Sequence, residues 1–245
     1  AVMGVRGGVG TSTVALNLAV TLAQKYKLVV NAAEFRPGNG AWALELGYVN
    51  PEGLHNLVQH KPEEITRDLL NQEVIPSAYG VRFLLSSNLA SDVDAINSTA
   101  QFEAVTRQLA ATADISLIDI GSSQLPCAGE VLARCNEVIL VLDPHPMGVA
   151  RAKLLIEDLV AKGFGKGRMI TVAMVNRLRS DAVLSWSQVQ DTLSQSIAVT
   201  FTPVPELAYQ AAVRLVPLVM LQPDGLHAQQ FTKLAEIIAQ HAHKE

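Results

Sequence analysis

Short apolar runs alternate along the chain with longer segments in which apolar residues recur at helical spacing. Most of the short runs are apolar at consecutive positions, which is typical of parallel strands covered on both faces. These runs predict strands at Val2–Val5, Lys27–Ala33, Val81–Leu85, Ile115–Ile120, Val138–Leu142, Met169–Val175 and Ile197–Phe201. The intervening patterns predict helices at Ser12–Gln24, Thr99–Ala111, Gly148–Lys162 and Leu226–His241.

This alternation predicts an α/β fold in which a doubly wound, mostly parallel sheet carries helices on both faces. The chain has 245 residues, of which 49% are hydrophobic, and this suits one large domain with a sizeable core. No repeat, low-complexity tract or linker interrupts the sequence, so we expect a single domain over residues 1–245. The abrupt start in a strand leads us to expect that the domain was cut from a longer chain or processed.

Charge and cysteine content narrow the classes of function. The net charge is −4 and the pI is about 5.9, whereas non-specific DNA binding favours a basic surface. The densest basic cluster, Lys162, Lys166 and Arg168, predicts a solvated loop. The apolar run Ile170–Val175 is far too short to span a bilayer. Two cysteines are too few for a disulfide scaffold, and a reducing cytoplasm is the simplest setting.

A glycine-rich segment stands between the first predicted strand and the first predicted helix. Such a strand–turn–helix position is the context that a phosphate-binding loop requires. Glycines allow backbone N–H groups to approach a phosphate, and the N-terminus of the next helix faces the anion. Ser12 and Thr13 offer hydroxyls to a phosphate oxygen and to Mg²⁺. The segment therefore predicts a nucleotide site, the alternative being a glycine turn without a ligand. The residues of this glycine-rich segment are Arg6, Gly7, Gly8, Val9, Gly10, Thr11, Ser12 and Thr13.

The loop departs from the general pattern G-x-x-x-x-G-K-[ST] at two positions. Val5 stands at the first glycine and Thr11 at the lysine. The missing lysine removes a charge-assisted hydrogen bond of roughly 1.5–3 kcal/mol. This corresponds to about ten- to a hundredfold in affinity. Because backbone amides and Mg²⁺ could still hold a nucleotide, we expect binding with slow hydrolysis at most.

The loop resembles that of the MinD/ParA family, the deviant Walker ATPases, which reads K-G-G-x-G-K-[ST]. The family's signature lysine falls on Arg6, and the resemblance implies that Arg6 reaches across a dimer to the partner's nucleotide. The family's second strand often ends in D-x-D, where this chain has Ala32 and Glu34. In active members the first carboxylate positions the attacking water, so its loss argues against efficient hydrolysis. A shift of about two residues would place Glu34 there instead.

Further motifs follow in the family's order. Ser116–Gly121 resembles the Walker B strand, and the resemblance implies that Asp119 holds Mg²⁺ through water. The alternative is that Asp119 caps the next loop. Met174–Arg177 resembles a V-N-R element, in which the amide of Asn176 would read the adenine edge, the alternative being a turn-forming asparagine. The resemblance implies nucleotide contacts by Gly7, Gly8, Val9, Gly10, Thr11, Ser12, Thr13, Asn176, Arg177 and Pro205, metal binding by Ser12 and Asp119, and catalytic roles for Asp119 and Arg6.

One branch of the family shares finer features with this chain. G-G-V-G-T-S-T at Gly7–Thr13 and a short helical stretch within Phe35–Leu46 resemble the CpaE/TadZ branch, linked to Flp pilus assembly and polar localisation. Members often carry a receiver-like domain before the ATPase domain. The resemblance implies a cytoplasmic homodimer that binds ATP or ADP with Mg²⁺. It would position an unidentified partner of a pilus or secretion complex, at a pole or at the membrane through partners.

Other interpretations of the sequence stay open. Val5, Thr11 and Ala32 favour a pseudo-ATPase scaffold that dimerises without nucleotide, and an ordinary ATPase or kinase is a third alternative. Cys127 resembles a cluster ligand of the nitrogenase iron protein, but no cysteine precedes it, which argues against an iron–sulfur cluster. The final predicted helix has few basic residues, so we expect it to pack on the protein's own sheet rather than on a membrane.

Overall fold

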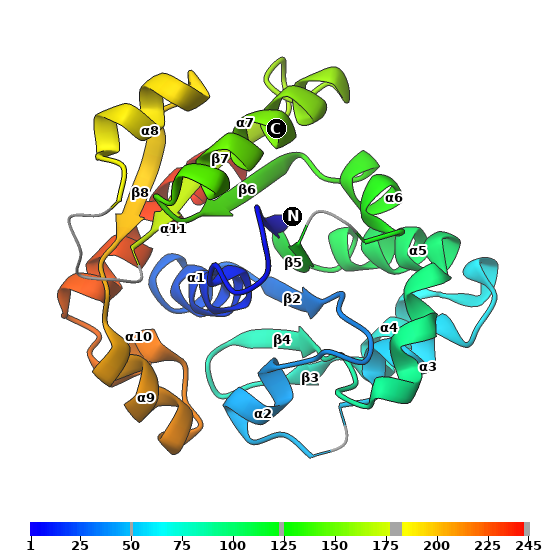
Figure 1. Ribbon diagram of the computed structural model, residues 1–245. Helices are drawn as coiled ribbons and strands as arrows, with labels where there is room; N and C mark the ends of the chain where they lie inside the picture. The colour runs from blue at the N-terminus through cyan, green and yellow to red at the C-terminus, as the bar shows by residue number, and fades with distance from the viewer. Residues whose placement is uncertain (50, 123–124, 177–182, 243–245) are drawn as a thin grey trace.

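The computed structural model describes residues 1–49, 51–122, 125–176 and 183–242. Its strands are β1 (Val2–Gly4), β2 (Val30–Glu34), β3 (Ile75–Pro76), β4 (Val81–Leu84), β5 (Ile115–Ser122), β6 (Glu137–Leu142), β7 (Met169–Val175) and β8 (Ile197–Phe201). The strands of these residues form one eight-stranded sheet in the order β3-β4-β2-β5-β1-β6-β7-β8. All neighbouring strands are parallel except β3 and β4, which confirms the predicted mostly parallel sheet (Figure 1).

Helices cover both faces of this sheet, as the alternating pattern predicts. The α-helices are α1 (Thr11–Tyr26), α2 (Trp42–Leu46), α3 (Gly53–Val58), α4 (Arg67–Glu73), α5 (Thr99–Ala110), α6 (Ala128–Ala133), α7 (Pro146–Ala161), α8 (Trp186–Leu193), α9 (Pro205–Arg214), α10 (Leu218–Leu221) and α11 (Leu226–Ala242). The 3₁₀ helices are η1 (Pro62–Glu64) and η2 (Ala90–Asn97). On one face α1 packs on β1, β2 and β5 and against α11. The other face carries α5 beside α6, and α7 beside α8 (Figure 1).

The strand order fixes where a ligand could bind. The chain passes from β1 outward to β2 and β4, then returns to β5 beside β1 and continues to β6 on the other side. The connections on the two sides of β1 therefore lie on opposite faces, which leaves a crevice at the carboxyl end of β1. The loop that joins β1 to α1 begins in this crevice.

The ends of some elements differ from the prediction. The second strand begins at Val30, three residues later than the predicted Lys27, because α1 extends to Tyr26. Lys27 caps this helix with φ 56°, a left-handed conformation that is incompatible with a strand. The short helices α3, α4 and α6 and the antiparallel strand β3 were not predicted, since segments of two to seven residues are too short to show a period.

Two expectations about surface segments have different outcomes. The interpretation of the basic cluster as a solvated loop is wrong for Arg168, whose guanidinium stacks 3.8 Å from the ring centroid of Phe164. Arg168 Nε also donates to the Cys135 carbonyl oxygen at 2.8 Å, so this side chain holds the segment that leads into β6. In contrast, α11 packs on α1 and β8 through a buried face that includes Phe231 and Leu234, which confirms its predicted placement. None of the helices in the described ranges has the length and apolar character needed to cross a bilayer.

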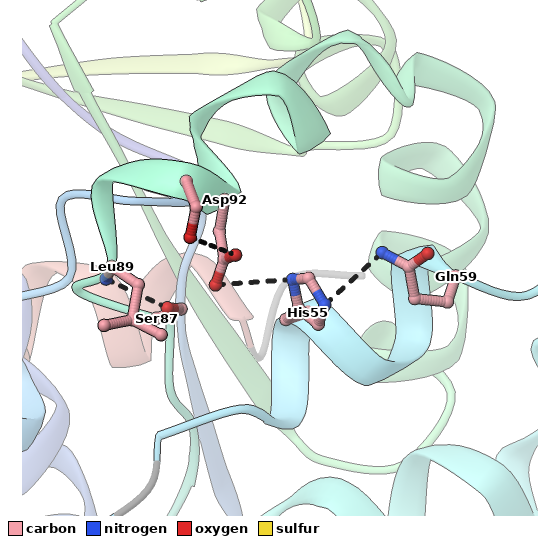
Figure 2. A network of polar contacts seen from close by, with 6 residues as sticks. His55, Gln59, Ser87, Leu89 and Asp92 are labelled. Carbon is pink, nitrogen blue, oxygen red and sulfur yellow. Dashed lines mark hydrogen bonds and ion pairs between the residues drawn. The ribbon is translucent and has the colours of Figure 1, made fainter.

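A polar network on the outside of the molecule joins α3 to η2 (Figure 2). His55 Nδ1 lies 3.5 Å from Asp92 Oδ2, and Ser87 Oγ accepts a hydrogen bond from the Leu89 N–H at 3.1 Å. The hydroxyl of Ser87 lowers the pKa of Asp92 below its usual value, and His55 lowers it further. His55 Nε2 faces Gln59 rather than a serine, so these residues brace the loop after β4 and do not form a nucleophilic triad.

Candidate functional site

A cavity of about 730 Å³ lies at the carboxyl edge of the sheet. The β1–α1 loop forms its floor, the β2–α2 loop and the end of β5 form one side, and the ends of β7 and β8 with the start of α9 form the other. Its lining includes nearly all the residues predicted to contact a nucleotide: Arg6, Gly7, Gly8, Val9, Gly10, Thr11, Ser12, Thr13, Asn176 and Pro205. Arg177 lies outside the described residues.

The β1–α1 loop has the backbone that its glycines permit. Gly8 and Gly10 take φ values of 74° and 98°, a left-handed conformation that side chains disfavour. Gly10 is the N-cap of α1 and offers no side chain to the first turn. The Val14 N–H closes the first helical bond on the Gly10 carbonyl at 2.9 Å. The N–H groups at the start of α1 are therefore left for an anion in the cavity.

Asp119 lies behind Ser12 at the end of β5 and has no exposed surface. Its Oδ1 accepts a hydrogen bond from the Gly121 N–H at 2.8 Å, whereas Oδ2 is buried without a hydrogen-bond partner in the described ranges. Burial raises the pKa of Asp119, against the opposing effects of the Ser12 hydroxyl, the Gly121 N–H and Arg36. A hydroxyl that lines the cavity, backed by a carboxylate with an orphaned oxygen, fits the oxygen ligands that Mg²⁺ prefers.

The described part of the chain contains no cluster of three or more His, Cys, Asp or Glu side chains that could hold a metal by themselves. Magnesium sites of nucleotide-binding proteins need no such cluster, because phosphate oxygens and waters complete the coordination.

Asn176 stands at the opposite end of the cavity, directly after β7. Its N–H donates to the Phe201 carbonyl at 2.9 Å, while its side-chain Oδ1 is buried and has no partner in the described part of the chain. Pro205 starts α9 beside it. The cavity therefore has backbone N–H groups of the first turn of α1 at one end and an amide side chain with an unused acceptor at the other.

Comparison with solved structures identifies this architecture. The chain superposes on a ParA family ATPase from Chlorobium tepidum with a TM-score of 0.81 at 17% identity, over 96% of this chain and 95% of that one. The septum site-determining protein MinD from Pyrococcus horikoshii, complexed with Mg-ADP, gives 0.77 at 21% identity over 96% and 94%. MinD in the MinC:MinD complex of Aquifex aeolicus gives 0.74 at 16% identity over 97% and 94%.

The chain has the fold of the ParA and MinD ATPases. No protein-family model matches it, and no curated protein sequence does. The structural superpositions establish the fold. At sequence identities of 16% to 21% they do not establish the function, which has to be argued from the groups that line the cavity.

On this ParA/MinD fold, Thr11 occupies the place of the loop lysine. Thr11 is buried and its hydroxyl points back to β1, where a Cβ on Gly4 would collide with Thr11 Oγ1. The absence of a side chain at Gly4 therefore makes room for Thr11. Residue 11 supplies no cation to the cavity.

The acidic residue of β2 is Glu34, at the carboxyl end of the strand, whereas position 32 is an alanine. Ala32 pairs with Phe83 and Leu117 in the fully buried middle of the sheet. Glu34 lies opposite Asp119 at the carboxyl edge, so the acid beside Asp119 is Glu34. Glu34 Oε1 accepts a hydrogen bond from the Ala41 N–H at 2.7 Å. Burial raises the pKa of Glu34 to about 8, and the Asp119 carboxylate contributes in the same direction.

Arg6 is engaged within its own chain. Its guanidinium donates a hydrogen bond to Asp143 Oδ2 and forms an ion pair with that carboxylate. The Arg6 side chain is 42% exposed, whereas that of Asp143 is 10% exposed. Arg6 therefore lies at the rim of the cavity, held against the end of β6. Its role toward a second copy stays a prediction.

Sequence reasoning missed several residues of the cavity lining, among them Arg36 and His227. Arg36 follows β2, and its Nη1 donates to Ser12 Oγ at 2.7 Å. His227 lies at the start of α11 among the rings of Phe201 and Phe231, with centroid separations of 5.6 and 5.1 Å. Burial lowers the pKa of His227 to about 4, and its Nδ1 has no hydrogen-bond partner among the described residues. A cation directly after a buried strand could have drawn attention to Arg36, but no sequence pattern points to His227.

Proposed function

We propose that this protein binds ATP or ADP with Mg²⁺ in the cavity and acts as a nucleotide-dependent, dimerising spatial organiser of the MinD/ParA type. One observation carries the proposal. The anion-binding loop, the Ser12–Asp119 pair and the Asn176 amide, which are far apart in the sequence, line or back a single cavity. The Mg-ADP bound by MinD of Pyrococcus horikoshii, which has the same fold, supports this choice of ligand.

Each part of the cavity has a separate task in this proposal. The N–H groups from Gly10 to Thr13 would bind the phosphates, because the start of α1 has no side-chain cap. Ser12 and Asp119 would hold Mg²⁺, which neutralises charge on the phosphate oxygens. Asn176 would accept a hydrogen bond from the adenine amino group through Oδ1. The rings of Phe201 and Phe231 offer an apolar wall at the same end.

Hydrolysis would be slow at most. Stabilising charge on the transferring phosphoryl group is the main catalytic contribution in such enzymes. Thr11 brings no charge to the phosphates, and Ala32 cannot orient a water. Glu34 is buried and bonded to the Ala41 N–H, a geometry that suits bracing the next loop better than activating a water.

The output would be a nucleotide-dependent surface for a partner rather than a chemical product. Aquifex MinD forms a complex with MinC, which supports a protein partner in general terms. The resemblance of the Gly7–Thr13 loop to the CpaE/TadZ branch supports a partner in a pilus assembly or similar polar machine.

The test measures thermal unfolding and oligomeric state with and without ATP and Mg²⁺. A ligand that binds only the folded state raises its stability by about 2.7 kcal/mol at a hundred times the dissociation constant. We expect a rise in Tm of several degrees and a shift toward a dimer. Ser12→Ala should reduce the part of the Tm rise that depends on Mg²⁺. Ser187→Ala, which changes an exposed serine on α8, should leave the Tm rise unchanged. No change in either Tm or oligomeric state would rule out the organiser.

A pseudo-ATPase scaffold that dimerises without nucleotide is the second candidate. The buried hydroxyl of Thr11 and the engagement of Arg6 by Asp143 within one chain favour it. Constant dimerisation without nucleotide would support the scaffold. Micromolar binding of a fluorescent ATP analogue would eliminate it.

A further inference from the structure

Two of the described residues that line the cavity are cationic, Arg6 and Arg36. Arg6 is engaged by Asp143 at the rim. Arg36 lies over the start of α1, with Nη1 2.7 Å from Ser12 Oγ. Ser12 directly follows Thr11, the position at which a phosphate-binding loop ordinarily carries its lysine. A positive charge is therefore present beside the loop, although it comes from the end of β2.

Several contacts fix the segment that carries Arg36. The Phe35 N–H donates to the Asp119 carbonyl at 2.9 Å, and the Asn39 N–H donates to the Arg36 carbonyl at 2.9 Å. The buried indole of Trp42 donates through Nε1 to the Ser12 carbonyl at 3.2 Å. The β2–α2 segment is thus fastened to β5 just before Arg36 and to the first turn of α1 after it. A side chain held in this way loses little freedom when it binds a ligand.

The Arg36 side chain lines the cavity. Its charge opposes the rise in pKa that burial causes in three nearby carboxyl groups, those of Glu34, Glu45 and Asp119. Gly121, with φ 62°, faces the guanidinium, and a Cβ at this position would lie 3.4 Å from Arg36 Nε. Arginine has five N–H donors in a planar fork that matches phosphate oxygens. Among the described residues, Ser12 is the acceptor of the hydrogen bond that Arg36 makes. The remaining donors can therefore serve a phosphate on the loop.

We propose that Arg36 supplies the phosphate-binding cation that this loop lacks at Thr11. The proposal rests on the nucleotide-binding function above and names the residue that gives it charge. In a standard loop the lysine reaches the β- and γ-phosphates, and Arg36, bonded to the residue after that position, would contact the same phosphates. The lysine of a standard loop projects from the helix itself, whereas this cation approaches from the neighbouring strand.

The test is calorimetric titration of ATP with Mg²⁺, and of adenosine, into the wild type and its variants. Arg36→Gln should weaken the binding of ATP at least tenfold and leave the affinity for adenosine unchanged. Arg36→Lys keeps the positive charge without the planar guanidinium, and it should lose less ATP affinity than Arg36→Gln. Arg107→Gln removes an exposed guanidinium from α5, away from the cavity, and this variant should bind ATP like the wild type.

Rescue separates a direct role from a structural one. Thr11→Lys added to Arg36→Gln should recover a large part of the ATP affinity, because it returns a cation to the loop. Equal loss of ATP and adenosine affinity in Arg36→Gln, or a folded double variant without recovery, contradicts the assignment. If the double variant does not fold, Arg36→Lys decides, and a loss of ATP affinity as large as that of Arg36→Gln overturns the assignment.

The titrations also separate the two proposals. A wild type that does not bind ATP refutes nucleotide binding itself, whereas equal ATP affinity of the wild type and Arg36→Gln refutes the role of Arg36 alone.

Discussion

Glu34 and Asp119 face each other at the ends of β2 and β5, and neither side chain is exposed. Each has one oxygen bonded to a backbone N–H and one buried oxygen without a hydrogen-bond partner in the described ranges. Two carboxylates this close and this buried do not both ionise readily. Since burial raises the pKa of Glu34 to about 8, this acid is mainly protonated at neutral pH.

Glu34 therefore makes the stability of the protein depend on pH in a definite direction. Between the ordinary pKa of 4.5 and the folded value of about 8, the folded chain keeps a proton that the unfolded chain loses. Stability then falls as the pH rises through this window. Each unit of pKa difference corresponds to about 1.4 kcal/mol. Glu34→Gln should remove this loss and raise Tm more at pH 8 than at pH 5.

Thermal unfolding across this pH range measures the effect. Glu63→Gln, at an exposed position of η1, serves as the control and should leave the profile unchanged. A Glu34→Gln profile parallel to that of the wild type would mean that Glu34 is ionised in the folded protein.

The sequence indicates some residues of the site far better than others. The loop residues and Asp119 belong to one strand–turn–helix segment and one buried strand, where local pattern and position coincide. The contact between Arg36 and Ser12 depends on how the β2–α2 loop folds over α1, and the place of His227 depends on the packing of α11 against β8. Such contacts arise from tertiary structure, which no local pattern encodes.

At the scale of elements, the β2–α2 loop connects the sheet to the phosphate end of the cavity. It contacts α1 through Trp42 and packs against the loop after β4, where Gly40 touches the backbone of Ser86. The network of His55 and Asp92 braces the same region from outside (Figure 2). The position of Arg36 therefore depends on how closely these two loops approach.

Gly40→Ala tests this close approach. A Cβ at Gly40 would overlap the carbonyl oxygen of Ser86, and this backbone can yield only if the loop moves. Overpacking of this kind costs about 1–3 kcal/mol. We expect a lower Tm together with weaker ATP binding, as measured by thermal unfolding and by titration.

The matched control is Gly129→Ala in α6, where a Cβ meets nothing within 4 Å. This change should stabilise the protein slightly, by about 0.4–1 kcal/mol, because alanine restricts the unfolded chain. Equal behaviour of the two variants would show that the loop after β4 does not constrain Gly40.

Element prediction succeeded where the pattern was long or uniformly apolar. β7 and β8 begin and end where their apolar runs predict, and α5 matches its prediction to within one residue. The second strand was misplaced at its start because the left-handed cap at Lys27 looks like any other polar residue in the sequence. The helices between β2 and β4 are too short for a period to stand out.

At the scale of the whole molecule, the crevice at β1 follows from the strand order alone. Right-handed crossovers place the connections that run to either side of β1 on opposite faces of the sheet, and the crevice lies where they separate. The alternating sequence pattern predicts the fold class, whereas the strand order comes from the structure. Exposed apolar side chains on α2 and α9, such as Leu44, Tyr209 and Val213, lie on elements that border this cavity. In the proposed dimer, nucleotide would bind next to this surface, which gives a physical route from ligand to assembly.

The central claim is that bare peptide amides, assisted by a cation from β2, hold a nucleotide in this cavity. A crystal structure grown with ATP and Mg²⁺ tests it most directly. We predict phosphates on the N–H groups from Gly10 to Thr13, Arg36 in contact with them, and the base beside Asn176. A structure at saturating ATP with no nucleotide density in this cavity would contradict the claim.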